Sequence, residues 1–459
     1  MMQAMSLAGI TPRIQGTLKG SDLFFSGVSI DTRTLEPGDL YVALVGERFD
    51  GHDFIPDAVR AGACAVIAEQ PLELEVPLIQ VGNSRRALGL LAAVNREAFE
   101  GGVVAVTGSS GKTTTRTMLT EVFSGAGSVL SSEGNLNNEI GAPLTLFRLS
   151  PGIDFAIIEL GASGVGEIAW TGSLTAPHVG IITNASEAHV SGFGSLENIV
   201  IGKGELIDAV AADGTVVLNH DDPAFERWHE RAGNRRVLST SAQGNPEAAF
   251  RAQDISEEPD GVAFRMESSV WAPLDVRIPL PGRHNVSNAL LTAAAAYAQG
   301  LDPEIVVSGL ARMSSVAGRL EPITLRPGVT VLNDSYNANP ASMDAALQAL
   351  SHMPGRRVAM LGDMAELGDD AQARHETVGA RARELGIDLL MATGDYAGVY
   401  GRGFGEPTTI AETPEMLADQ LWDQLDGPVS ILVKGSRSAG MDRAVAQLRK
   451  RNDNECFSG

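Results

Sequence analysis

The stretch that decides the fold of this chain is Thr107-Gly108-Ser109-Ser110-Gly111-Lys112-Thr113-Thr114. An apolar run, residues 103–106, precedes it, and residues 115–123 after it are compatible with a helix. A strand, a glycine-rich turn, a Lys-Thr pair and a helix, in this order, are typical of a phosphate-binding loop. The backbone N–H groups of such a turn and the lysine ammonium bind the phosphates of ATP, and the following hydroxyl binds Mg²⁺. We therefore predict an ATP site formed by Gly108, Ser109, Ser110, Gly111, Lys112, Thr113 and Thr114.

This loop does not match the complete phosphate-loop pattern. The pattern begins with a glycine, whereas Val106 occupies the corresponding position in this chain. The alternative interpretation is an ordinary Ser/Gly turn that caps a helix. The strand before the turn and the helix after it favour the ATP site, because they are the context in which such loops bind phosphate.

The composition is that of a globular enzyme with several domains. The chain has 459 residues, of which 44% are apolar and 20% charged, and this length predicts about two to four domains. The formal net charge of -22 argues against nucleic acid as a partner, because phosphate contacts require Lys and Arg. Cys64 and Cys456 lack metal-ligand spacing. We find no signal-peptide pattern and no membrane-spanning apolar run, so we expect a cytoplasmic protein.

Short apolar runs separated by turns divide the chain into three blocks. We predict domains at residues 1–100, 101–314 and 315–459. Strand-like runs alternate with helical stretches in the second block and most regularly in the third, which predicts parallel sheets with helices on both faces. The predicted fold class is α/β with three domains. These are a small N-terminal α/β domain, a central P-loop-type ATP-binding α/β domain and a C-terminal Rossmann-like α/β domain.

The strands of the third block share a feature at their ends. Each is followed by polar or glycine residues, namely Asn333-Asp334, Gly362-Asp363, Gly394-Asp395 and Lys434-Gly435-Ser436. Any single strand that leads into a turn can end in this way. Four such endings predict a second binding site, because ligands of parallel sheets bind at the carboxyl ends of the strands.

Two residues outside the loop are candidate metal ligands. Glu159 ends an apolar run, residues 155–158, where a Mg²⁺ ligand opposite the phosphate loop is expected. His189 follows a second apolar run, residues 179–182. A lone histidine in such a position is more often a loop or core residue than a ligand, so the pattern alone leaves its role open.

Lys203 lies on the apolar face of a predicted helix. The apolar positions of this helix recur at helical spacing, at Leu196, Ile199, Val200, Ile207 and Val210. The common explanation is a lysine whose stem is buried and whose amine reaches water. The alternative is a buried lysine that loses its proton easily and takes part in chemistry.

Landmarks from about residue 25 to residue 440 resemble those of the Mur ligase family of bacterial cell-wall synthesis. Besides the phosphate loop they lie at residues 134–138, 159, 184–189, 202–205, 282–288, 318–319 and 334–336. Four stretches resemble the member that adds D-alanyl-D-alanine to UDP-N-acetylmuramoyl-tripeptide, namely residues 28–33, 337–343, 361–368 and 434–438. The Asp-Asn-Pro-Arg motif of the sibling that adds diaminopimelate or lysine is absent from the sequence.

The resemblance implies an ATP-dependent amide ligase of peptidoglycan synthesis. ATP would phosphorylate the terminal carboxylate of the tripeptide, and the amine of D-alanyl-D-alanine would then displace phosphate. The resemblance implies catalytic roles for Lys112, Lys203 and His189, with ATP and two Mg²⁺ ions as cofactors. Thr113 and Glu159 would bind one Mg²⁺, and a carbamylated Lys203 would bind the second beside His189.

The resemblance also implies contacts to both substrates. The ATP contacts are Asn288 for adenine, Arg319 for phosphate and Asp334 for ribose. The contacts of the other substrate are Ser29 and Arg33 for uridine diphosphate, and Asn135 and Asn138 for the muramoyl-peptide arm. We expect the protein to be a monomer.

Two other classes of protein stay open. Another ATP-driven ligase on the same scaffold, such as a folylpolyglutamate synthetase, would place its phosphate loop near the N-terminus, unlike this chain. A non-catalytic nucleotide-binding switch would need neither a second metal site nor a ligand edge on the third block. Phosphate release that depends on both the muramoyl tripeptide and D-alanyl-D-alanine would distinguish the three classes.

Overall fold

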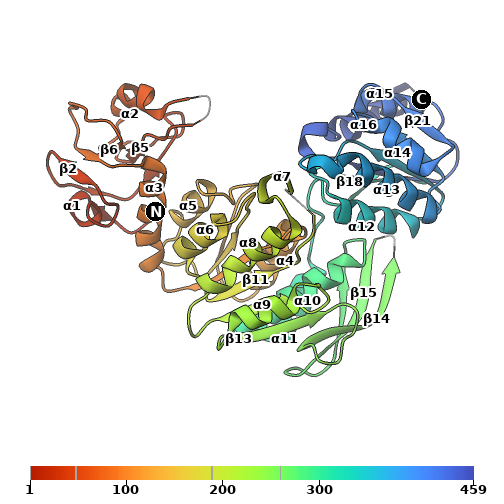
Figure 1. Cartoon of the computed structure of the whole chain (residues 1–459), viewed down its shortest axis with the longest axis horizontal. Coiled ribbons are helices and arrows are strands. Elements are labelled where there is room, and N and C mark those ends of the chain that lie inside the picture. The colour runs from red at the N-terminus through yellow and green to blue at the C-terminus, as the bar shows by residue number, and fades with distance from the viewer. Residues whose placement is uncertain (1, 47–48, 188–189, 259, 459) are drawn as a thin grey trace.

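The structure has one large sheet in each of three domains. The computed structural model describes residues 2–46, 49–187, 190–258 and 260–458. Figure 1 shows the N-terminal domain at one end, the C-terminal domain at the other and the middle domain between them. The predicted α/β fold with three domains is confirmed. No helix of the described ranges has the length and apolar character needed to cross a membrane.

The N-terminal domain contains a five-stranded sheet with the order β2-β7-β6-β5-β4. Its strands are β2 (Thr17–Lys19), β7 (Leu78–Gln80), β6 (Ala65–Ala68), β5 (Leu40–Val42) and β4 (Val28–Ser29). β2 is antiparallel to β7, and the other neighbours are parallel. The remaining elements are β1 (Met5–Ser6), β3 (Phe24–Phe25), α1 (Leu7–Ile10), α2 (Ile55–Ala61) and α3 (Ser84–Glu97).

The middle domain contains a nine-stranded sheet with the order β16-β15-β14-β13-β12-β11-β8-β10-β9. Its strands are β8 (Gly102–Thr107), β9 (Val129–Ser131), β10 (Phe155–Glu159), β11 (Val179–Ile182), β12 (Thr215–Asn219), β13 (Arg236–Ser241), β14 (Phe250–Glu258), β15 (Gly261–Ser268) and β16 (Leu274–Ile278). Its helices are α4 (Lys112–Phe123), α5 (Gly141–Leu146), α6 (Glu167–Thr175), α7 (Val190–Phe193), α8 (Leu196–Ala209), α9 (Phe225–Ala232), α10 (His284–Ala298) and α11 (Pro303–Ala311).

Strand β8 has a buried core on each face of this sheet. Val104 and Val106 pack in a cluster that includes residues of α4, α10 and α11. Val103 and Ala105 point to the other face, where residues of α3, α5, α6 and α8 complete a second cluster. Successive side chains of a strand alternate between faces, so a continuous apolar run fits a strand covered on both sides. Helix α3 thereby joins the N-terminal domain to the core of the middle one.

The end of the middle sheet differs from the predicted alternation of strands and helices. β14, β15 and β16 are consecutive antiparallel strands, with no helix between them. Along most of β14, half-buried and exposed residues alternate, as in a strand with one face in water. The prediction of a purely parallel sheet with helices between the strands is therefore wrong for this part of the domain.

The C-terminal domain contains a six-stranded sheet with the order β17-β18-β22-β19-β20-β21. Its strands are β17 (Glu321–Arg326), β18 (Val329–Asp334), β19 (Arg356–Leu361), β20 (Leu389–Ala392), β21 (Thr408–Ile410) and β22 (Val429–Lys434). Its helices are α12 (Pro340–Ser351), α13 (Ala371–Glu384) and α14 (Ala397–Phe404) on one face, and α15 (Pro414–Trp422) and α16 (Asp442–Ser458) on the other. Only β17 is antiparallel to its neighbour, so the parallel-sheet prediction holds for the rest of this described sheet.

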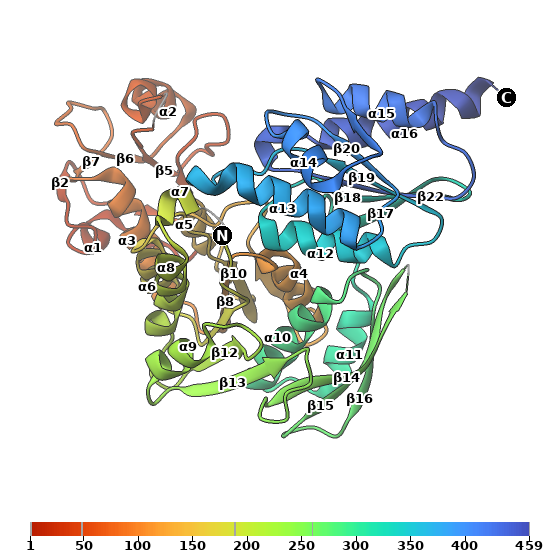
Figure 2. The same ribbon diagram turned by 45° about the vertical axis from the view of Figure 1, so that its right-hand side comes forward.

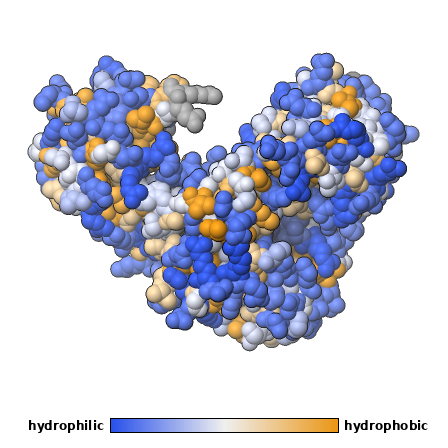
Figure 3. All heavy atoms as spheres, in the orientation of Figure 1, coloured by the Kyte–Doolittle hydropathy of each residue, from blue (hydrophilic) through white to orange (hydrophobic). Residues whose placement is uncertain are grey.

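The predicted domain boundaries fall in loops. Residue 100 lies between α3 and β8, and residue 314 lies between α11 and β17. These boundaries remain our proposal. Figure 3 shows a wide hollow between the N-terminal and C-terminal domains, with apolar residues scattered over this face of the molecule.

Candidate nucleotide site between the middle and C-terminal domains

The phosphate loop joins β8 to α4, and two of its glycines are required by close contacts. Gly108 has φ +146°, and a Cβ there would lie 1.9 Å from Oγ1 of Thr183. Gly111 has φ +81°, and a Cβ there would lie 2.6 Å from Oδ1 of Asn288. A side chain at either position would collide with its neighbour, so the turn in this form requires glycine at both.

The segment after β11 holds the loop in place. The Ser110 N–H donates to Oδ1 of Asn184 at 2.9 Å, and the Thr183 hydroxyl donates to the Ser110 carbonyl at 2.6 Å. The Ser109 hydroxyl donates to the carbonyl of Ser186 at 2.9 Å. The loop is therefore fixed by side chains and carbonyls of a neighbouring strand end, which pre-organises its N–H groups at the start of α4.

The side chain of Lys112 folds back onto the phosphate loop. Its Nζ donates to the carbonyl of Gly108 at 2.6 Å and to that of Ser109 at 3.3 Å. Burial lowers the pKa of Lys112 to about 8, while the Glu159 carboxylate opposes that shift. An anion bound at the loop would favour the charged ammonium, so Lys112 is suited to binding phosphate.

Glu159 and Thr113 form the part of the site that fits a magnesium ion. The Thr113 hydroxyl donates to Oε1 of Glu159 at 3.2 Å, and the Asn137 side-chain amide donates to the same oxygen at 2.9 Å. Oε2 of Glu159 is buried and has no hydrogen-bond partner among the described residues, although Nε of Arg116 lies 3.6 Å away. A free carboxylate oxygen beside a hydroxyl suits Mg²⁺, which prefers oxygen ligands.

Among the described residues, acidic, histidine and cysteine side chains alone do not form a second metal position. Within the described ranges, no three such side chains are grouped so that they could hold an ion. His189, the predicted ligand of a second Mg²⁺, lies outside the described residues.

Lys203 is buried in α8 with 1% of its surface exposed. Its Nζ donates to the carbonyl of Ala162 at 3.3 Å and lies 5.1 Å from the centre of the Phe193 ring. Burial lowers the pKa of Lys203 to about 7, and the nearby charge of Lys112 adds to the shift. The amine does not reach water, so the snorkelling interpretation is wrong. That Lys203 takes part in chemistry stays a prediction.

The C-terminal domain forms the opposite wall of a cavity of about 890 Å³. The cavity is lined by Ser109 to Thr114 from the loop and, among the other predicted contacts, by Asn135, Asn288, Arg319 and Asp334. This volume is in the range of small-molecule sites. The cavity thus brings together predicted ATP contacts from both domains, as expected for a nucleotide that bridges them.

Predicted ATP contacts also have partners within the protein. Asn288 accepts a hydrogen bond from the Thr115 hydroxyl at 3.2 Å. The Arg319 guanidinium lies 4.2 Å from the centre of the Tyr336 ring. Asp334 accepts from the Leu320 N–H and from an ammonium on β22, so both of its oxygens are engaged. These contacts fix the three side chains in the cavity wall before any ligand binds.

The predicted muramoyl-peptide contacts separate in the structure. Asn135 lines the cavity. Asn138 does not line it, and its Oδ1 accepts from the N–H groups of Gly141 at 2.9 Å and Ile140 at 3.2 Å, just before α5. Its neighbour Asn137, which the sequence did not single out, contacts Glu159.

The predicted uridine-diphosphate contacts lie in the N-terminal domain. The Ser29 hydroxyl donates to the carbonyl of Asp31 at 3.0 Å, and Arg33 forms an ion pair with the Asp31 carboxylate at 2.6 Å. Hydrogen bonds from Arg33 lower the pKa of Asp31 to about 2. No described residue of this domain lines the nucleotide cavity, so a substrate held here would have to reach across the hollow.

Contacts between the middle and C-terminal domains surround the cavity. The Asn339 side-chain amide donates to the Ser110 hydroxyl at 3.2 Å. Arg374 of α13 forms an ion pair with Glu187 at 2.5 Å, and the Ser191 N–H at α7 donates to the carbonyl of Glu366 at 3.2 Å. Figure 2 shows α7 close to the start of α13. Asn339 lies in one of the stretches that carry the resemblance, residues 337–343, but sequence reasoning assigned it no contact.

Comparisons with known proteins agree along the whole chain. The families described as "Mur ligase family, catalytic domain", "Mur ligase middle domain" and "Mur ligase, glutamate ligase domain" match residues 25–96, 106–296 and 318–456. The UDP-N-acetylmuramoyl-tripeptide–D-alanyl-D-alanine ligase of Escherichia coli is 41% identical, and the match covers 98% of this chain and 99% of that protein.

Two solved structures have the same fold over nearly the same length. MurF from Acinetobacter baumannii is 32% identical with a TM-score of 0.92, and the match covers 98% of this chain and 99% of that one. MurF ligase from Thermotoga maritima, solved in complex with ADP, is 28% identical with a TM-score of 0.86, covering 94% and 98%. The sequence landmarks, the three-domain fold and these matches show that this chain belongs to the Mur ligase family.

Proposed function

We propose that this protein is the ATP-dependent ligase that joins D-alanyl-D-alanine to UDP-N-acetylmuramoyl-tripeptide in peptidoglycan synthesis. The observation that carries the proposal is the cavity between two domains. The phosphate loop of the middle domain lines one side of it, and strand ends of the C-terminal domain line the other. The E. coli relative, which matches this chain over almost its whole length, is named for this activity. The protein would act in the cytoplasm as a monomer.

The reaction has two chemical steps. The terminal carboxylate of the tripeptide attacks the γ-phosphorus of ATP, which forms an acyl phosphate and releases ADP. The amine of D-alanyl-D-alanine then attacks the acyl carbon, loses a proton and expels inorganic phosphate from a tetrahedral intermediate. Both steps need reactants aligned and negative charge neutralised, so positioning and electrostatics account for most of the catalysis.

The phosphate loop and the C-terminal domain would bind different parts of ATP. N–H groups of residues 108–114 and the ammonium of Lys112 would bind the phosphates. Arg319 is placed to add a second positive charge from the C-terminal domain, since it lines the same cavity. Asn288 and Asp334 would bind adenine and ribose. A site assembled from two domains excludes water during the transfer, and this protects the acyl phosphate from hydrolysis.

Magnesium would be held by the Thr113 hydroxyl and the Glu159 carboxylate, where a free oxygen fits it. The ion would neutralise phosphate charge. Carbamylation of Lys203 would replace a buried amine by an anion able to hold a second ion together with His189. The low pKa of Lys203 supports this assignment, because only the neutral amine reacts with CO₂.

The uridine diphosphate would bind the N-terminal domain near Ser29 and Arg33. The muramoyl-peptide arm would contact Asn135 and Asn138. A nearby alternative is another amino-acid ligase on this scaffold, such as a folylpolyglutamate synthetase. The complete N-terminal domain ahead of the phosphate loop favours the UDP-linked substrate instead.

Phosphate release measured with purified protein, ATP and Mg²⁺ tests the proposal. We expect turnover only when UDP-N-acetylmuramoyl-tripeptide and D-alanyl-D-alanine are both present. Equal turnover with free diaminopimelate or L-lysine as the amine would overturn the substrate assignment and leave the family intact. Phosphate release without any amine would instead indicate a nucleotide hydrolase.

A further inference from the structure

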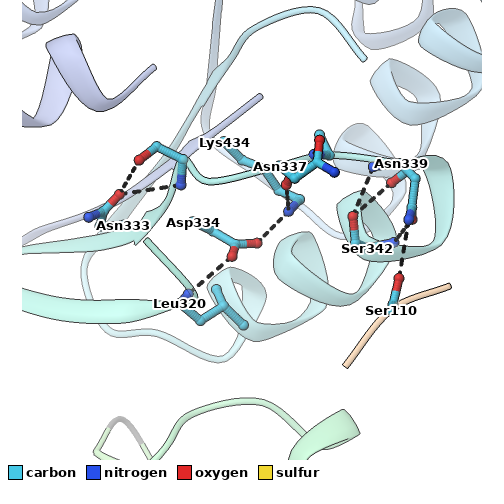
Figure 4. Close-up of polar contacts among 10 residues, drawn as sticks. Ser110, Leu320, Asn333, Asp334, Asn337, Asn339, Ser342 and Lys434 are labelled. Atoms are coloured by element: carbon cyan, nitrogen blue, oxygen red, sulfur yellow. Dashed lines mark hydrogen bonds and ion pairs between the residues drawn. The ribbon is translucent and has the colours of Figure 1, made fainter. Parts of the chain in front are cut away.

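Lys434 lines the nucleotide cavity and joins two segments of the C-terminal domain. It ends β22, directly beside Asp334 at the end of β18, and has 2% of its surface exposed. Its Nζ donates to Oδ2 of Asp334 at 2.5 Å and to the carbonyl of Asn337 at 2.9 Å (Figure 4). One buried ammonium thus fixes a strand end and the turn that follows it.

Through Asp334, this contact reaches the linker between the domains. The second oxygen of Asp334 accepts the Leu320 N–H at 3.1 Å. Leu320 has φ +48°, a left-handed conformation that is strained for a non-glycine residue. The neighbouring Arg319 points into the cavity wall and packs on Tyr336. The ion pair therefore helps to hold the strained linker that presents Arg319.

Through the turn at Asn337, the contact reaches the phosphate loop. Two residues farther on, Asn339 caps α12, because its Oδ1 accepts the Ser342 N–H at 2.8 Å. The other end of the same amide, Nδ2, donates to the Ser110 hydroxyl at 3.2 Å. Figure 4 shows this chain of contacts running from Lys434 to Ser110. The cap and the contact between domains use one side chain.

We propose that Lys434 is a positioning residue for nucleotide binding. It holds the linker with Arg319 and the turn with Asn339 in the arrangement that closes the C-terminal edge on the phosphate loop. Lys434 acts through these two segments rather than through the reacting atoms. The inference rests on the proposed nucleotide site. It adds a residue that couples the C-terminal wall of the cavity to the phosphate loop on the opposite wall.

The affinity of the full-length protein for ADP, measured by titration calorimetry with Mg²⁺, tests the inference. We expect Lys434→Met to weaken ADP binding by about tenfold or more, because small displacements of binding groups have effects of this size. Lys450→Met makes the same change at an exposed position of α16 and should stay within about twofold of the wild type. If Lys434→Met does not fold, Lys434→Gln, which keeps one donor, should weaken binding in the same direction.

A second substitution separates positioning from direct contact with the nucleotide. Asn339→Ser keeps a side chain that caps helices but is too short to reach Ser110, and it should weaken ADP binding. In the double variant Lys434→Met/Asn339→Ser, ADP binding should be no weaker than in Lys434→Met alone, because the contact is already lost. Losses that multiply would overturn the inference, as would a folded Lys434→Met variant that binds ADP as tightly as the wild type. A wild-type protein that binds no ADP would refute the proposed function itself.

Discussion

The middle and C-terminal domains each bury a lysine, and the two lysines differ in their partners. Lys203 has 1% and Lys434 has 2% of its surface exposed. Lys434 forms an ion pair with Asp334 at 2.5 Å, whereas Lys203 has no carboxylate within ion-pair distance in the described part of the chain and contacts the Ala162 carbonyl. Burial lowers the pKa of both amines. Asp334 opposes that shift for Lys434 through direct contact, whereas Glu167 and Glu205 oppose it for Lys203 only through their charge.

This difference indicates that burial alone does not define the role of a lysine. A buried amine with a carboxylate partner keeps its proton and fixes the segments around it. A buried amine without such a partner gives up its proton easily, and the neutral form can react with CO₂. We therefore assign Lys434 to positioning and Lys203 to chemistry, and the following predictions test that division.

Removal of the whole C-terminal domain should have the largest effect. A protein ending at residue 314 should fold, because the described cores of the first two domains contain no residue beyond Met313. It should bind ATP weakly and catalyse no ligation, since Arg319 and Asp334 are lost. Circular dichroism and phosphate release measure the two properties. Full ligase activity of residues 1–314 would contradict a nucleotide site shared by two domains.

Substitution of the unpaired lysine should abolish most of the chemistry. We expect Lys203→Ala to lose about a hundredfold or more in kcat, as is typical when one electrostatic group of an active site is removed. Its free energy of unfolding should change by less than about 2 kcal/mol, because the loss of packing is offset by removal of a buried amine.

Chemical rescue distinguishes the carbamate from a structural amine. Formate or acetate should restore part of the activity of Lys203→Ala by filling the vacated space with an anion. Lys203→Arg, which keeps a cation and cannot be carbamylated, should not respond. Near-wild-type turnover of Lys203→Ala would show that Lys203 is structural, and the contrast with Lys434 would disappear.

Substitution of the paired lysine should lower stability in addition to weakening ADP binding. Lys434→Met leaves the buried Asp334 carboxylate without its cation, and breaking such a pair costs about 3–5 kcal/mol. Urea denaturation should show this loss in the transition of the C-terminal domain. The double variant Lys434→Met/Asp334→Asn, without either charge, should recover most of it, because buried pairs are often replaceable by uncharged groups. A double variant as unstable as the single one would mean that packing of the lysine stem is responsible.

Local patterns of the sequence were sufficient for part of this site. The phosphate loop depends on consecutive residues, and the buried position of Lys203 follows from helical periodicity. Of the four polar strand ends of the third block, two reach the cavity, since Asp334 and Lys434 end neighbouring strands and both line it. A second binding site at this edge stays a prediction. Such features are readable because the residues involved are close in sequence or share a period.

The contacts between these features were not predictable in the same way. Lys434 and Asp334 are 100 residues apart, and Asn339 and Ser110 are 229 apart. Which strand ends meet depends on the strand order of the sheet, which places β22 between β18 and β19. The antiparallel strands β14 to β16 were missed because their one-sided burial differs from the continuous apolar runs of the parallel strands.

Removal of an exposed ion pair between the N-terminal and middle domains should have the smallest effect, and it is the reference for the buried pair of Lys434. Arg85 of α3 contacts Glu139 at 2.5 Å, with 39% and 44% of the side chains exposed. Pairs so exposed typically contribute less than about 1 kcal/mol, so Arg85→Ala should barely change the urea midpoint or the affinity for ADP. The apolar packing of α3 against α5 and α6 should hold the N-terminal domain in place. A loss larger than about 2 kcal/mol would show that this surface pair, rather than the shared core, fixes the two domains, and that solvent exposure does not separate weak pairs from strong ones in this protein.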